Sequence, residues 1–119
     1  MEEWLPNVPT RKYSLGMRKK LGIAIALLGN PRFVLLDEPF NGLDPSGTIA
    51  LKVLLRETAQ RGVGILISSH LLDSLDRIYD DLIVLKSGKV WFLGNKEEVQ
   101  ERCGRGATLE DLYQTVIRP

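Results

Sequence analysis

Apolar residues recur at helical spacing near the start of the chain and then gather in two short continuous runs. Between Ser14 and Leu28 they fall on every third or fourth position, which predicts a helix that has Ser14 as its N-cap. The runs 33–36 and 64–67 are bounded by turn-forming residues, which is typical of strands buried on both faces of a parallel sheet. Residues 1–12 show no period, and we expect an irregular leader there.

The segment between the two runs carries the start and stop signals of a second helix. Asp44 is a suitable N-cap and Pro45 suits the first helical turn, while Gly62 ends the periodic pattern. We expect the apolar face of this helix to consist of Ile49, Val53 and Leu54.

The second half of the chain predicts short helices around a hairpin. Thr108 and Asp111 have the spacing of a capping box, so a helix should begin at Thr108. The other predicted elements are a helix over about 71–79, hairpin strands at 82–85 and 90–93 joined across 86–89, and a helix over about 96–102.

Strands and helices alternate along this chain, which is typical of an α/β fold with a short parallel sheet, flanking helices and right-handed crossovers. The hairpin adds a β element near the C-terminus. With so few strands, one face or edge of the parallel sheet would stay open.

The composition predicts one small cytoplasmic domain and adds little else. The chain has 119 residues, 44% of them hydrophobic, and a formal charge of +1, which gives no general attraction to nucleic acid. No apolar run is long enough to cross a membrane, and the first residues lack the pattern of a signal peptide. The single cysteine, Cys103, permits no internal disulfide and is interpreted as a helix-end thiol in a reducing compartment.

Side chains that can handle a metal and a phosphate follow both predicted strands. Asp37 and Glu38 come directly after the first run and His70 follows the second, and ligands bind at this carboxyl edge of parallel sheets. One carboxylate can hold a hydrated Mg²⁺, and the next can orient or deprotonate a water. A neutral histidine can donate a hydrogen bond to a phosphoryl oxygen. Taken singly, each has an ordinary interpretation: solvated carboxylates, a surface histidine, and turn chemistry at Gly42 and Pro45.

The order and spacing of four segments resemble the ATP-binding cassette (ABC) ATPases. Tyr13 to Met17 is similar to the signature motif of that family, in the form found in ABC-2-type exporters of bacteria. Residues 33–38 resemble the Walker B strand with its catalytic glutamate, residues 41–44 resemble the D-loop, and His70 resembles the H-loop histidine. The resemblance covers nearly all of the chain from Tyr13 onward.

The resemblance implies a role for each matching residue. Asp37 would bind Mg²⁺, Glu38 would act on the attacking water, and His70 would contact the γ-phosphate of ATP. Asp44 would couple two subunits of a dimer. The signature-like residues, Ser14, Leu15, Gly16 and Met17, would contact ATP held by the opposite subunit. Two of them depart from the family motif: Leu15 stands where the family has glycine, and Met17 stands where it has glutamine.

No phosphate-binding loop of the form Gly-x-x-x-x-Gly-Lys-[Ser/Thr] occurs in the sequence. The only Gly-Lys pair, Gly88-Lys89, lies in the predicted hairpin turn. We therefore expect the C-terminal half of an ABC ATPase domain, inactive in ATP binding and hydrolysis when alone. Its parts would be a signature helix region at 1–30, a Walker B, D-loop and H-loop core at 31–94, and C-terminal helices at 95–119.

Three functional hypotheses remain open from the sequence. The first is an ATP-binding and ATP-hydrolysing subunit of an ABC transporter, an exporter by its signature form. It would work with a second ATPase subunit, a membrane subunit and an N-terminal half that carries the phosphate loop, at the inner face of the cell membrane. The alternative is a non-catalytic module that dimerises with a full ABC ATPase and completes its ATP site. The third is an ABC-type ATPase acting on DNA or the ribosome, against which the exporter-like signature argues.

Overall fold

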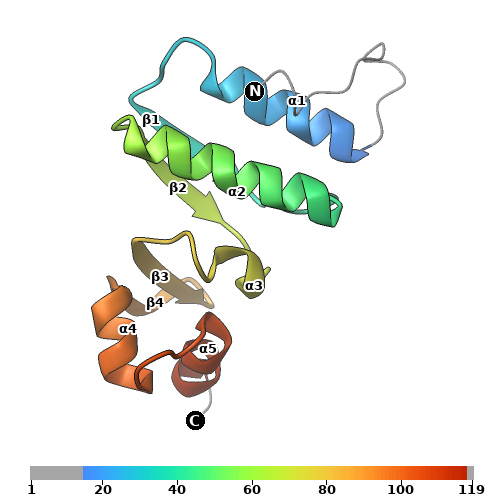
Figure 1. Ribbon diagram of the computed structural model, residues 1–119. Coiled ribbons are helices and arrows are strands. Elements are labelled where there is room, and N and C mark those ends of the chain that lie inside the picture. The colour runs from blue at the N-terminus through green and yellow to red at the C-terminus, as the bar shows by residue number, and fades with distance from the viewer. Residues whose placement is uncertain (1–14, 118–119) are drawn as a thin grey trace. The chain divides into compact units, whose positions relative to one another are not determined.

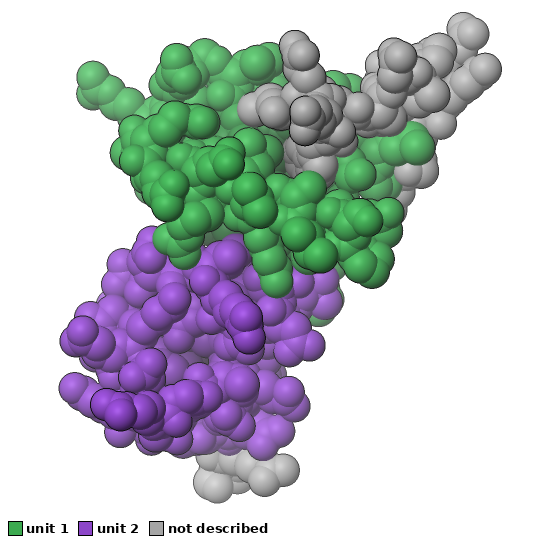
Figure 2. All heavy atoms as spheres, in the orientation of Figure 1, with its two compact units in different colours: residues 1–70 green, residues 71–119 purple. Residues whose placement is uncertain are grey.

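The chain folds as two units, residues 1–70 and residues 71–119, and each is described by itself (Figure 2). A computed structural model describes residues 15–117 (Figure 1). The predicted leader at residues 1–12 and the predicted N-cap Ser14 lie outside the described residues. No helix in the described part of the chain is long and apolar enough to cross a membrane.

The first unit contains the predicted parallel sheet. Strand β1 (Phe33–Asp37) pairs in parallel with β2 (Gly64–Ser68), and the register runs from Phe33 opposite Gly64 to Asp37 opposite Ser68. The prediction that the first strand is buried on both faces was wrong: Val34 and Leu36 are buried, but Phe33 and Leu35 are exposed. The side chains of a strand alternate between the two faces of the sheet, so one face of β1 is covered and the other is open.

Two helices pack against this sheet, α1 (Leu15–Leu27) against β1 and α2 (Pro45–Gln60) against β2. Because Val34 and Leu36 are the buried residues of β1, we infer that both helices cover that face. The helices supply most of the other buried side chains of this unit, which include Ile23, Ala24, Leu27, Leu51 and Leu55.

The buried face of α2 differs from the predicted one. Ile49 and Val53 are exposed, and the helix is buried through Gly47, Leu51, Leu55 and Thr58 instead. These four positions share one face at helical spacing, but two of them are small or polar. A pattern of large apolar residues therefore selects the wrong face of this helix.

The second unit consists of a hairpin and three short helices. Strands β3 (Asp81–Lys86) and β4 (Lys89–Asn95) form the predicted antiparallel hairpin, so β3 belongs to a separate sheet and does not extend β1 and β2. Helix α3 spans only Leu72–Leu75, shorter than the predicted 71–79, because the chain turns at 76–78. Helices α4 (Lys96–Cys103) and α5 (Leu109–Ile117) complete the unit.

One face of the hairpin and the two last helices enclose the core of this unit. Its buried members are Phe92, Val99, Leu112 and Val116. The predicted capping box is present at the start of α5, where the Thr108 and Asp111 side chains and backbone amides exchange hydrogen bonds of 2.9 and 3.1 Å. A second capping box, not predicted from the sequence, joins Asn95 and Glu98 at the start of α4.

Candidate functional site

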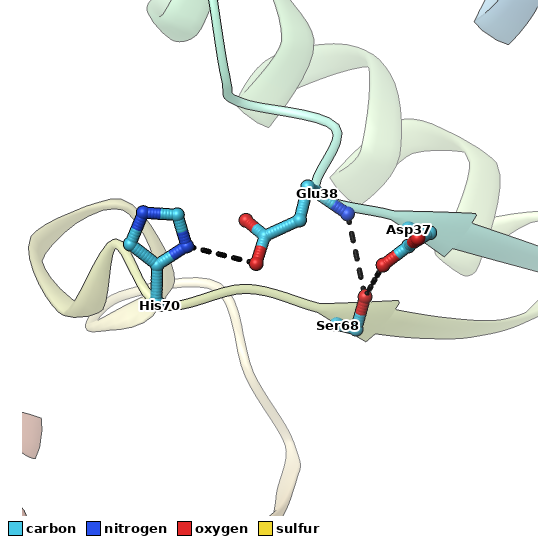
Figure 3. Close-up of polar contacts among 4 residues, drawn as sticks. All are labelled: Asp37, Glu38, Ser68 and His70. Atoms are coloured by element: carbon cyan, nitrogen blue, oxygen red, sulfur yellow. Dashed lines mark hydrogen bonds and ion pairs between the residues drawn. The ribbon is translucent and has the colours of Figure 1, made fainter.

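Asp37 and Ser68 lie opposite each other where the two parallel strands end. They form the last pair of the register, and the Ser68 hydroxyl donates a hydrogen bond to Asp37 Oδ1 (Figure 3). Both residues are exposed. No motif in the sequence indicates a role for Ser68. Its partner depends on the register between two strands about thirty residues apart, which no local motif reveals.

Glu38, the next residue, has its backbone in the left-handed region, with a φ of 50°. Residues other than glycine rarely adopt this conformation, which costs on the order of 1–3 kcal/mol. The Glu38 amide donates to the Ser68 carbonyl at 2.8 Å and to the Ser68 hydroxyl at 3.3 Å, which holds the turn in place. The chain thus leaves the strand sharply and turns the Glu38 side chain toward His70 (Figure 3).

His70 contacts the carboxylate of Glu38. Its Nδ1 atom lies 2.8 Å from Glu38 Oε1. The His70 side chain is 69% exposed and that of Glu38 is 30% exposed. Among the described residues, the second carboxylate oxygen of Glu38, Oε2, is buried and has no hydrogen-bond partner. Since a buried acceptor without a donor is costly, this oxygen is available to a water or another donor.

Asp44 caps α2, as predicted. Its Oδ1 atom accepts a hydrogen bond of 2.8 Å from the Gly47 amide, and Pro45 occupies the first turn of the helix. The packing at Gly47 is tight, because a Cβ atom on it would lie 2.8 Å from Asp44 Oδ1 and 3.2 Å from Cε of Lys20 on α1. The side chain of Asp44 is thus engaged at its own helix, and its predicted role between subunits stays a prediction.

The signature-like residues are distant in the sequence from the cluster formed by Asp37, Glu38, Ser68 and His70. Leu15, Gly16 and Met17 form the first turn of α1, and Ser14 lies outside the described residues. The predicted contact of all four is with ATP held by another subunit, and it remains a prediction.

The donor atoms at the strand ends fit magnesium better than a softer metal. A carboxylate and a hydroxyl are oxygen ligands, and Mg²⁺ commonly uses one or two carboxylates together with waters and substrate phosphates. Within residues 15–117, no three His, Cys, Asp or Glu side chains group to form a metal site. Asp37, with the Ser68 hydroxyl beside it, therefore fits a hydrated Mg²⁺.

Comparison with known proteins identifies the family. Residues 5–76, more than half of the chain, match the family model described as "AAA domain, putative AbiEii toxin, Type IV TA system". The ABC-type transporter ATP-binding protein EcsA of Bacillus subtilis is 38% identical over 114 residues, which are 95% of this chain and 46% of EcsA. The lantibiotic transport ATP-binding protein SrtF of Streptococcus pyogenes is 40% identical over 82 residues, which are 69% of this chain and 36% of SrtF.

A solved structure agrees with these relatives. The ATP-binding subunit of an ABC transporter superimposes on this chain with a TM-score of 0.81 at 35% identity, covering 91% of this chain and 45% of that subunit. The chain therefore belongs to the AAA domain family, and its homologues are ATP-binding proteins of ABC transporters. It spans less than half the length of each of these relatives.

Proposed function

We propose that this chain carries the metal-binding and water-activating part of the Mg-ATP hydrolysis site of an ABC transporter. The observation that supports the proposal most strongly is the run of contacts from Asp37 through Ser68 to Glu38 and on to His70 (Figure 3). It joins the carboxyl ends of two adjacent parallel strands, the edge at which such sheets bind ligands.

Each residue of the cluster has a distinct task in this proposal. Asp37, oriented by the Ser68 hydroxyl, would hold Mg²⁺ through its waters, and the ion would supply positive charge to the phosphate oxygens. Glu38 orients the attacking water and accepts its proton. The positive φ of Glu38 turns its carboxylate away from the strand, so the two acidic side chains serve different groups.

His70 must change its hydrogen bonding to contact a phosphate. A neutral imidazole that donates from Nδ1 to Glu38 has no proton on Nε2. While Nδ1 donates to Glu38, Nε2 can donate to a phosphoryl oxygen only if the ring carries both protons. Once His70 leaves Glu38, a neutral ring can donate from either nitrogen, depending on its tautomer. Contact with the γ-phosphate through Nδ1 would then free the Glu38 carboxylate for water.

The phosphate-binding loop of the site has to come from outside the 119 residues, because the sequence contains none. Backbone donors and a lysine that cradle phosphates contribute several kcal/mol to binding. The chain alone should therefore bind and hydrolyse ATP negligibly. In the assembled transporter it would act in a dimer of ATPase subunits beneath a membrane subunit, at the cytoplasmic face, and the signature form of 13–17 favours an exporter.

A chimera tests the proposal. The 114-residue matching segment of EcsA is replaced by the corresponding part of this chain, and steady-state ATP hydrolysis is measured for the purified protein. We expect hydrolysis that Glu38→Gln lowers by roughly 10²-fold or more, since general base catalysis contributes about 10²–10⁴. Glu57→Gln, which changes an exposed glutamate on α2, is the control and should leave the rate unchanged.

A folded chimera that hydrolyses ATP equally well with Gln at position 38 would contradict the assignment of Glu38. A folded chimera without activity would favour the second candidate function, a non-catalytic module that completes the ATP site of a full ABC ATPase. One observation favours that module: Leu15, Gly16 and Met17 begin a helix of 13 residues, and anions bind well at the N-terminus of a helix. Its capture of an intact ATPase subunit should depend on Ser14 and Gly16.

A further inference from the structure

The Ser68 hydroxyl occupies one of the two carboxylate oxygens of Asp37. It donates its proton to Asp37 Oδ1 from the neighbouring strand, at the last position of the register between β1 and β2 (Figure 3). Within residues 15–117, the other oxygen, Oδ2, has no hydrogen-bond partner, so it remains for a cation or for the waters around one. The two oxygens of Asp37 are therefore not equivalent toward a metal.

This hydroxyl is not needed to hold the turn that follows β1. The Glu38 amide donates to the Ser68 carbonyl at 2.8 Å, and its second contact, with the Ser68 hydroxyl, is longer at 3.3 Å. Because every residue has a backbone carbonyl, the turn keeps its shorter bond whatever side chain stands at position 68. The distinct contribution of the serine side chain is thus its hydrogen bond to Asp37.

The other acidic side chain of the cluster, Glu38, is engaged by His70. Glu38 Oε1 lies 2.8 Å from His70 Nδ1, and Oε2 is buried. In the part of the chain that the structure describes, no three His, Cys, Asp or Glu side chains group into a metal site. The cluster therefore offers a cation one carboxylate, of which one oxygen already accepts a hydrogen bond.

We propose that Ser68 is a specificity-determining residue, which restricts Asp37 to one oxygen and thereby selects Mg²⁺ over Ca²⁺. The proposal rests on the proposed function, because it concerns the cation that accompanies ATP. Ca²⁺ takes about six to eight oxygen ligands and often binds both oxygens of a carboxylate, whereas Mg²⁺ keeps several of its waters. With Oδ1 hydrogen-bonded, Asp37 can hold a cation or its waters through Oδ2, but it can chelate a cation only by weakening its bond to Ser68.

Charge cannot provide this selectivity. The two ions carry the same charge, so attraction to the Asp37 carboxylate does not distinguish them, and selectivity depends on the number and flexibility of the oxygen ligands. Removing the Ser68 hydroxyl frees Oδ1 and adds a ligand that Ca²⁺ uses better than Mg²⁺ does. Ser68 thus acts on the preference between ions, and Asp37 on the binding of either.

Nucleotide binding without hydrolysis tests the proposal. The EcsA chimera is titrated with Mg²⁺ or with Ca²⁺ in the presence of AMP-PNP, a non-hydrolysable ATP analogue, and the bound nucleotide is measured by equilibrium dialysis. The quantity compared is the ratio of the two ion concentrations at half-maximal binding. The free nucleotide has the same affinity for each ion in every experiment, so a change in this ratio between variants reports on the protein.

Ser68→Thr and Ser68→Val form the matched pair, because threonine and valine have nearly the same shape and differ in the hydroxyl. Ser68→Thr should keep the wild-type ratio. Ser68→Val should shift the ratio roughly fivefold or more toward Ca²⁺, since hydrogen bonds to charged groups are among the stronger polar contacts. Both residues are β-branched and suit a strand, so their effects on folding should be alike. Equal ratios for the two variants would overturn the proposal.

Infrared spectroscopy of the chimera requires no substitution at Ser68. The separation between the antisymmetric and symmetric carboxylate bands narrows when both oxygens bind one cation. With isotope-labelled aspartate, and with Asp37→Asn as the reference from which the Asp37 bands are obtained by difference, we expect a wide separation with either ion. A narrow separation with Ca²⁺ would contradict the restriction of Asp37 to one oxygen.

The outcomes separate this proposal from the proposed function. A chimera that hydrolyses ATP but shows the same ion preference with Ser68→Val would reject the role of Ser68 and leave the catalytic function standing. A chimera that hydrolyses no ATP but shows the shift in ion preference would reject the catalytic function and support the role of Ser68. Nucleotide binding that is independent of both ions would reject the metal site at Asp37 and, with it, this role.

Discussion

Ser68 donates a hydrogen bond to Asp37 across the end of the parallel sheet, and the backbone amide of Glu38 donates to the same serine. One hydroxyl thus connects the two acidic residues of the candidate site, and it does so from the neighbouring strand. The geometry of both acidic residues therefore depends on the pairing of β1 with β2, whose last register position joins Asp37 to Ser68.

This connection predicts an energetic coupling between the two side chains. Ser68→Ala and Asp37→Ala should each lower the free energy of unfolding, and the double mutant should lose less than the sum. We expect a coupling of about 0.5–1.5 kcal/mol in a double-mutant cycle measured by urea denaturation. Ser68→Thr keeps the hydroxyl and should keep most of the stability. Additive losses would show that the contact contributes nothing measurable.

The cap of α2 predicts opposite outcomes for two glycine-to-alanine substitutions. Gly22 in α1 is exposed, and apart from its chain neighbours and the backbone of its own helix, no atom of the described residues lies within 4 Å of a Cβ atom placed on it. Gly22→Ala should therefore stabilise by about 0.5–1 kcal/mol through helix propensity. Gly47 lies in the first turn of α2, where the gain in helix propensity is smaller, and Gly47→Ala also pushes on Asp44 Oδ1. Loss of an N-cap costs about 1 kcal/mol. We expect Gly47→Ala to be neutral or destabilising in chemical denaturation.

Asp44→Asn provides the control for that comparison, because asparagine caps helices about as well as aspartate. It should retain the stability that Asp44→Ala loses. If Gly47→Ala stabilises the chain as much as Gly22→Ala, the side chain of Asp44 has room to move and the tight packing at the start of α2 is not a constraint.

The sequence predicted the elements of this fold more reliably than their environments. The runs at 33–36 and 64–67 became strands, and the residues with turn or cap chemistry, such as Asp44 and Thr108, ended or began elements as expected. The burial of each side chain was harder to predict, because it depends on which other residues pack against it. Ile49 has the side chain of a core residue but faces outward, whereas Gly47 and Thr58 are buried.

The candidate site shows the same division. Asp37, Glu38 and His70 could be predicted from their positions after apolar runs and from the resemblance to a family. The role of Ser68 could not be predicted, because it depends on the register between two strands. The positive φ of Glu38 could not be predicted either, because hydrogen bonds to that serine hold it. Local patterns identify the reactive groups, whereas non-local pairing determines how they are oriented.

The missing phosphate loop predicts the response of the chain to nucleotide. A ligand present at about 100 times its dissociation constant would stabilise a protein by roughly 2.7 kcal/mol, which raises the melting temperature by several degrees. We expect no such shift when the purified 119-residue chain is melted with saturating Mg-ATP. An upward shift that Asp37→Ala removes would reveal a nucleotide site within these residues and would refute the prediction.

The second unit should lose stability at high pH through Tyr79. Burial raises the pKa of the Tyr79 phenol above its ordinary value of about 10, and repulsion by the Asp76 carboxylate raises it further. The folded chain therefore keeps this proton at a pH at which the unfolded chain releases it. The resulting stability is fully present below about pH 10 and is lost as the pH rises through the raised pKa.

Tyr79→Phe isolates this contribution, since phenylalanine retains the ring over which Lys96 Nζ lies at 5.2 Å. The free energy of unfolding, followed by denaturant titration between about pH 8 and about pH 11, should fall less steeply in Tyr79→Phe than in the wild-type chain. Tyr113→Phe, which removes an exposed tyrosine of the same unit, is the matched control. Equal slopes for the wild-type chain and Tyr79→Phe would mean that the phenol titrates alike in the folded and unfolded states. That result would contradict the packing of Tyr79 against the core of the second unit and its proximity to Asp76.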